Sequence, residues 1–163
     1  MSKFYKMNIR LIAIGKTDDK NLDILIESYT KRWGFYINFS MEIIPDIKNS
    51  KNLSVQQQKQ KEGELILSKI SNTDYLVLLD ENGKSFSSLE FADDLQKKMN
   101  SGIKTLVFVI GGPYGFSDEV YQKSVGKISL SKMTFSHQMV RLFVIEQIYR
   151  AMTILKNEPY HHR

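Results

Sequence analysis

The segment that decides the fold reads TLVFVIGGPYGFS at residues 105–117, and the segment ISLSKMTFSHQMVR at residues 128–141 follows it closely. The first contains a predicted strand that ends at Ile110 and leads directly into the glycine loop GGPYG. The second begins as a short strand and ends in a polar loop, residues 131–136. Open α/β sheets bind their ligands at the carboxyl ends of strands, and glycine allows close approach because it has no Cβ. These two loops therefore predict the binding site of a small-molecule cofactor.

Strand and helix patterns alternate along the rest of the chain. Near-continuous apolar runs predict strands at residues 9–14, 37–44, 75–79, 104–110 and 127–130. The predicted helices run from a cap at Asp18 or Asp19 to Trp33, for about 15 residues after Ser54, from Ser87 or Ser88 to Met99, from Asp118 to Ser124, and from Gln138 to Lys156. This alternation predicts the α/β class, with one mainly parallel sheet flanked by helices. We expect a single domain over residues 7–163, preceded by an extension at residues 1–6.

Composition narrows the class of protein. The chain has 163 residues, of which 42% are hydrophobic and 25% charged, as in a globular protein with one full core. No apolar run approaches the ~20 residues of a membrane span, and the chain has 0 cysteines for disulfides or thiolate metal sites. We therefore expect a cytoplasmic protein without a membrane partner. The net charge of +5 favours a polyanionic partner such as nucleic acid, although an ordinary basic protein has the same balance.

The predicted last helix is apolar on nearly all of its sides, from Met139 to Leu155. Such a helix must be covered from several directions. A larger core would cover it, but a chain of this size has little core to spare, so a homodimer interface is the favoured explanation.

Three familiar site motifs are absent from the sequence. Gly83-Lys84-Ser85 is not a P-loop, because Leu78 stands where that motif requires glycine. GGPYG differs from GxGxxG and opens no long helix, which argues against a dinucleotide site. His161-His162 has no partner ligand at a zinc-like spacing, so no metal is expected.

His137 and Arg141 lie one helical turn apart at the start of the last helix, beside the 131–136 loop. Two interpretations of the pair stay open. The histidine caps the helix while the arginine lies on a solvated surface, or the arginine binds a phosphate or carboxylate group of the substrate. The tail carries a second candidate group, Tyr160 and His161 followed by Arg163, residue types that stack on and clamp unpaired RNA bases.

Four motifs in order carry a resemblance to a known family. They are Leu79-Asp80 with Gly83-Lys84, Phe108–Gly115 with its GGPYG loop, Leu130–His137 with its LSKMTF segment, and Tyr160-His161. Together they closely resemble the ribosomal RNA large subunit methyltransferase H family. Those proteins are SPOUT-class enzymes that methylate N3 of a pseudouridine in the large-subunit (23S) rRNA. The similarity covers residues 7–163, with one departure: Ser136 stands where the family usually has proline.

The resemblance implies a SPOUT-type fold with a deep trefoil knot in its C-terminal part, an exception to the rule that chains do not thread loops. It also implies a homodimer whose RNA site is shared between the subunits, acting on assembled ribosomes. The implied cofactor is S-adenosyl-L-methionine, and its implied contacts are Leu79, Gly111, Leu130, Ser131, Lys132, Met133, Thr134 and Phe135.

A sulfonium methyl group is already an activated electrophile, so the protein mainly has to position it against the attacking nitrogen. Our hypothesis is that the nucleotide is held by His137, Arg141, Tyr160, His161 and Arg163. One of these five residues would assist loss of the N3 proton, with His137 and Arg141 as the candidate catalytic residues, although direct loss to water stays open. Two other functions also stay open: a knotted methyltransferase for a different nucleoside or tRNA, which would differ in its tail, and a ribosome-associated factor without catalysis, against which the intact motifs argue.

Overall fold

The structure is a computed structural model that describes residues 6–34 and 36–162. Arg163 and most of the expected extension at residues 1–6 therefore lie outside the described residues. The strands are β1 (Asn8–Ile14), β2 (Asn38–Ile44), β3 (Tyr75–Ser85), β4 (Thr105–Ile110) and β5 (Gly126–Ser129). The helices are α1 (Lys20–Trp33), η1 (Ser50–Asn52, a 3₁₀ turn), α2 (Val55–Ser68), α3 (Ser88–Asn100), α4 (Asp118–Lys123) and α5 (His137–Leu155).

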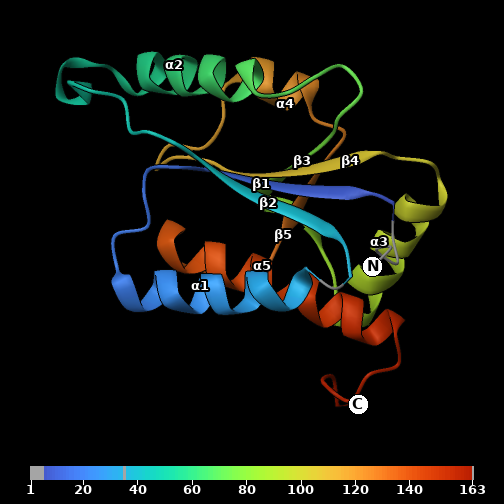
Figure 1. Cartoon of the computed structure of the whole chain (residues 1–163). Coiled ribbons are helices and arrows are strands. Elements are labelled where there is room, and N and C mark those ends of the chain that lie inside the picture. The colour runs from blue at the N-terminus through green and yellow to red at the C-terminus, as the bar shows by residue number, and fades with distance from the viewer. Residues whose placement is uncertain (1–5, 35, 163) are drawn as a thin grey trace.

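The five strands form one sheet in the order β2-β1-β4-β3-β5, and every neighbouring pair is parallel. This confirms the predicted α/β architecture with a parallel sheet. The connections that leave β1 and β4 go to opposite faces of the sheet (Figure 1). A ligand crevice is expected where neighbouring strands diverge in this way, so the carboxyl end of β4 is a favourable position for a site.

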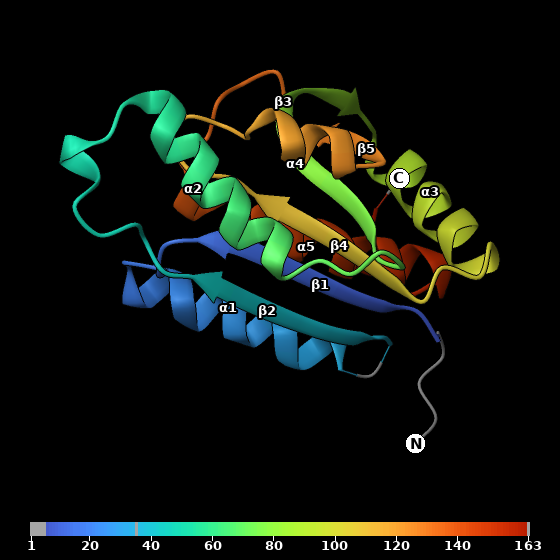
Figure 2. The same ribbon diagram turned by 90° about the horizontal axis from the view of Figure 1, so that it is seen from above.

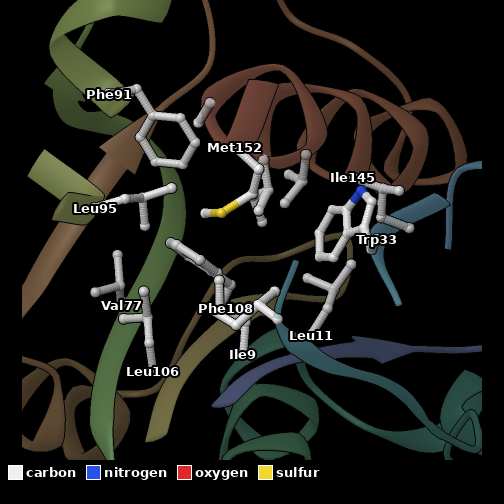
Figure 3. Close-up of a cluster of buried hydrophobic side chains, with 14 of the residues drawn as sticks. Ile9, Leu11, Trp33, Val77, Phe91, Leu95, Leu106, Phe108, Ile145 and Met152 are labelled. Carbon is white, nitrogen blue, oxygen red and sulfur yellow. The ribbon is translucent and has the colours of Figure 1, made fainter. Parts of the chain in front are cut away.

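Helices cover both faces of the sheet (Figures 1 and 2). α1, α3 and α5 lie on one face, and α2 and α4 lie on the other. Alternate residues of β1 supply the two cores, since Ile9 and Leu11 face the first group of helices while Ile12 faces the second. Figure 3 shows the first core, in which Trp33 of α1 and Met152 of α5 are both 0% exposed.

Short polar side chains begin four of the helices, and the sequence predicted three of them, Asp19, Ser54 and Ser87. Asp19, Ser54, Ser87 and Ser136 each accept a hydrogen bond from a backbone N–H in the first turn. Since Ser136 caps α5 by accepting from the N–H of Met139 at 3.2 Å, the interpretation of the next residue as the cap is wrong. The helix also begins one residue earlier than predicted.

One predicted boundary near the site is wrong. The third strand was expected to end at Leu79, but β3 continues to Ser85 through a register shift between Leu79 and Lys84. The strand can pair with β5 again only because residue 83 is glycine, since a Cβ there would lie only 2.6 Å from the backbone of Ile128. The extra residues, 80–83, bulge outward at the carboxyl edge of the sheet, and part of this bulge forms a wall of the site described next.

Candidate functional site

A cavity of about 500 Å³ lies at the carboxyl ends of β3, β4 and β5. Three segments form its walls: residues 79–82 after β3, residues 110–116 after β4, and the segment that joins β5 to α5. His137 and Val140 of the first turn of α5 complete the lining, together with Tyr121 of α4. The two loops that the sequence singled out therefore face one common space.

The cavity brings together most of the residues predicted to bind a cofactor. Its lining includes the predicted residues Leu79, Gly111, Leu130, Ser131, Met133, Thr134, Phe135 and His137. Lys132 is exposed and is not among the lining residues. The role of each residue in binding stays a prediction.

The glycines of the GGPYG loop are required by close packing. A Cβ on Gly111 would lie 3.0 Å from the ring of Phe116, and a Cβ on Gly112 would lie 2.5 Å from Oε2 of Glu62. Gly115 has a φ of +81°, and its N–H donates to the carbonyl of Gly112 at 3.2 Å, which closes a tight turn. The loop can therefore offer bare backbone to a ligand on the cavity side.

Asp80 and Tyr121 form a bridge between the walls of the cavity. The Tyr121 hydroxyl donates to Oδ2 of Asp80 at 2.5 Å, and the backbone N–H of Asn82 donates to Oδ1 at 2.8 Å. Burial, followed by the hydrogen bond to Asp80, raises the pKa of Tyr121 to about 12. The phenol therefore stays protonated and donates to Asp80 across the neutral pH range.

We expect Tyr121→Phe to lower the free energy of unfolding by about 1–2 kcal/mol at pH 8, because it removes the side-chain donor of Oδ2 of Asp80. Since the folded pKa of Tyr121 lies above its unfolded value of 10.0, this contribution is complete below pH 10 and is lost as the pH rises toward 12. Urea unfolding at several alkaline pH values measures both effects. The prediction is wrong if wild type and variant lose stability in parallel between pH 10 and 12.

The charge of the lining favours a cationic ligand. Among the lining residues, the acidic side chains are those of Asp80 and Glu81, and none of the lining residues is Lys or Arg. Other lining residues are apolar, among them Leu130, Phe135 and Val140. A molecule that combines an apolar or aromatic group with a positive charge therefore matches this lining.

The segment between β5 and α5 is exposed from Lys132 to His137, although it carries large apolar side chains. Met133 is 75% exposed and Phe135 is 38% exposed. On its other side lies a second cavity of about 350 Å³, lined by aromatic residues such as Phe86 and Phe91, and it shares the wall formed by residues 128–131. An exposed apolar segment between two cavities is suited to being covered by a ligand or a partner.

Arg141 is not a surface residue. Its side chain is 1% exposed, and its guanidinium donates to the carbonyl of Ile14 at 2.8 Å and to Oγ1 of Thr17 at 3.1 Å. The interpretation of this arginine as part of a solvated surface is therefore wrong. Within one chain these hydrogen bonds connect α5 to the end of β1 and the segment that follows it. His137, one turn earlier on α5, is exposed and lines the cavity.

The tail residues pack at the far end of α5 (Figure 1). The Tyr160 hydroxyl donates to Oε1 of Glu146 at 3.1 Å, and Nδ1 of His161 lies 3.3 Å from Nη1 of Arg150. The 19 residues of α5 rise about 28 Å along its axis, so these side chains lie far from the cavity of their own chain. The structure therefore does not bring Tyr160 and His161 together with His137 in one subunit.

Sequence reasoning missed the roles of Tyr121 and Glu62 at this site. The Asp80–Tyr121 bridge joins residues 41 positions apart and left no local pattern. A signal for close packing beside Glu62 was available in the next residue, Gly63, since glycine inside a helix is unfavourable. A Cβ on Gly63 would lie 2.3 Å from Oγ of Ser117, so this glycine allows α2 to pack closely under the end of the GGPYG loop segment.

Comparisons with known proteins agree with this geometry. A family model described as "Predicted SPOUT methyltransferase" matches residues 7–161. This match places the chain in the class of SPOUT methyltransferases. The chain is 78% identical over 157 residues to Ribosomal RNA large subunit methyltransferase H of Flavobacterium psychrophilum, covering 96% of this chain and 100% of the relative. It is 74% identical to the protein of that name from Flavobacterium johnsoniae, with the same coverage, and 64% identical to that of Parabacteroides distasonis, covering 96% of this chain and 99% of the relative. The chain therefore belongs to the ribosomal RNA large subunit methyltransferase H family, and its recognition from four motifs is confirmed.

Proposed function

We propose that this protein is an S-adenosyl-L-methionine-dependent methyltransferase that methylates N3 of a pseudouridine in large-subunit (23S) rRNA on assembled cytoplasmic ribosomes. The observation that carries the proposal is the cavity of about 500 Å³, where three of the four motifs that resemble the family meet at one edge of the sheet. Its acidic lining residues suit the positive charge of this cofactor, and its apolar lining residues suit an adenine ring. The proposed fold includes the family's trefoil knot within the C-terminal part of the chain.

The cofactor supplies a methyl group bound to a sulfonium when it occupies the cavity. In this proposal the backbone of Gly111 and Gly112 and the segment 130–135 hold it, and Asp80 faces its positive charge. His137, exposed on the cavity wall, binds the nucleotide or accepts its N3 proton. Arg141 orients the carboxyl end of β1 from its buried position, and direct contact with the nucleotide requires the segment around Thr17 to move aside.

A homodimer explains two otherwise separate observations. The apolar side chains of α5 are covered only in part, with Met139 38% exposed and Leu142 half-buried. The tail residues lie about 28 Å along α5 from the cavity of their own chain. If two copies pair through α5 in opposite directions, each tail approaches the cavity of the other copy, and one interface satisfies both observations.

Calorimetric titration of S-adenosyl-L-methionine into the purified protein, followed by a methylation assay on large ribosomal subunits, tests the proposed function. We expect saturable binding at one site per chain and transfer of a labelled methyl group to 23S rRNA that contains the pseudouridine. Subunits with uridine at the same position should accept far less methyl. Absence of binding, or equal transfer to tRNA, contradicts the proposal.

A further inference from the structure

Glu62 is a buried carboxyl group to which the proposed chemistry assigns no role. Its side chain lies in α2 and is 3% exposed. One oxygen, Oε1, accepts a hydrogen bond from Nε2 of Gln58 at 3.0 Å. The other, Oε2, is buried and has no hydrogen-bond partner among the described residues. Burying a carboxyl with an unpaired oxygen lowers stability, so a compensating role is expected.

The carboxyl lies directly against the glycine loop of the cavity. A Cβ on Gly112 would stand 2.5 Å from Oε2 and 2.7 Å from Oε1, so only glycine fits between the carboxyl and the space beyond it. Gly112 itself lines the cavity. The thickness of one glycine backbone therefore separates Glu62 from the ligand space.

We propose that Glu62 is a specificity-determining residue whose negative charge, acting across Gly112, favours the cationic methyl donor over the neutral thioether product, S-adenosylhomocysteine. The proposal rests on the proposed function, since it requires this cofactor in the cavity. Donor and product share the same adenosine and amino-acid groups and differ by the methyl group and one positive charge. A charge in a water-poor position discriminates between them more strongly than an exposed charge does.

The charges around Glu62 determine its response to the ligand. In the free protein the charged group that influences the pKa of Glu62 is Asp46, from the loop after β2. The hydrogen-bond partner of Glu62, Gln58, is neutral. Burial raises the pKa of Glu62, Asp46 raises it further, and the hydrogen bond from Gln58 opposes them. A cation in the cavity favours the ionised form and lowers the pKa. Binding of the donor therefore releases protons from Glu62, and its affinity rises with pH across the range in which Glu62 titrates.

Calorimetry with Glu62→Gln, and with Glu64→Gln as the matched control, tests this role. Glu64 lies two residues along α2, and its side chain is exposed. We expect E62Q to weaken S-adenosyl-L-methionine binding about tenfold and S-adenosylhomocysteine binding less than threefold. E64Q should leave both affinities unchanged. The thermal midpoint of E62Q should equal or exceed that of wild type, because the buried charge is gone.

Equal weakening of both ligands by E62Q, or no weakening, overturns the charge-based role. Failure of the wild type to bind either ligand contradicts the proposed function instead. If E62Q does not fold, titration of the wild type in buffers with different ionisation enthalpies decides the question. The donor should then release more protons than the product in the pH range in which Glu62 titrates, and equal proton counts throughout a pH series overturn the proposal.

Discussion

Replacing Gly111 by valine is expected to abolish S-adenosyl-L-methionine binding, with at least a ~100-fold loss of affinity. The Cβ alone would lie 3.0 Å from the Phe116 ring, which is tighter than an ordinary contact. The two methyl groups of valine extend further, so either the ring moves or the loop moves toward the cavity that Gly111 lines. Both movements reduce the space that the cofactor needs.

The control for this substitution is Gly126→Ala, at the start of β5. A Cβ on Gly126 meets nothing within 4 Å, and its φ is not positive, so we expect binding like that of wild type. Calorimetry gives both affinities, and far-ultraviolet circular dichroism checks that G111V keeps its fold. Binding of the cofactor by folded G111V within threefold of wild type would exclude this loop from the site.

The fold was predictable because its signals are local. β4 is a run of apolar residues and each of its last five is buried, as a strand covered on both faces requires. Ser54 and Ser87 begin their helices with reciprocal capping boxes that can be read from residues three positions apart. The glycine loop after β4 indicated the site for the same reason, since its glycines follow directly on the strand and can be read from the local sequence.

The remaining features depend on contacts between distant segments. β3 continues to Ser85 because Lys84 and Ser85 pair with β5, about 40 residues later in the chain. No sequence pattern around Leu79 reveals this pairing. The burial of Arg141 depends on the carbonyl of Ile14, 127 positions away. An arginine in an amphipathic turn is usually exposed, and only the tertiary fold shows that this one is not.

The chemistry of the site also depends partly on local sequence and partly on contacts between distant segments. The motif Leu79-Asp80 supplies one of the acidic side chains that line the cavity, whereas no motif indicated Glu62, which lies against Gly112 from the other side of the loop. These carboxylates come from separate elements. In the proposed function both face a positively charged ligand, which the motifs implied only through resemblance.

A chain that ends at Glu158 is expected to keep cofactor binding and to lose methylation by a factor on the order of 100 or more. The cut removes Tyr160 and His161 but retains the hydrogen bond that Tyr36 donates to Glu158. It also removes the bond from Tyr160 to Glu146, so stability should fall by about 1–2 kcal/mol, which leaves the domain folded. Methyl transfer to ribosomal subunits and calorimetry on the same preparation separate the two effects. Full activity of the shortened chain would remove the tail from the site.

Mixing this shortened chain with G111V determines which subunit supplies the tail. Each variant alone should be inactive, since one lacks the tail and the other lacks the cofactor site. If the tail acts on the cavity of the other copy, a mixed dimer contains one complete site, made from the cavity of the shortened chain and the tail of the G111V chain. Random exchange makes half of the dimers mixed, each with one complete site of two, so about a quarter of wild-type activity should return. If each tail instead folds back to its own cavity, no complete site forms and the mixture stays inactive. The roughly 28 Å that α5 places between tail and cavity favours the first result.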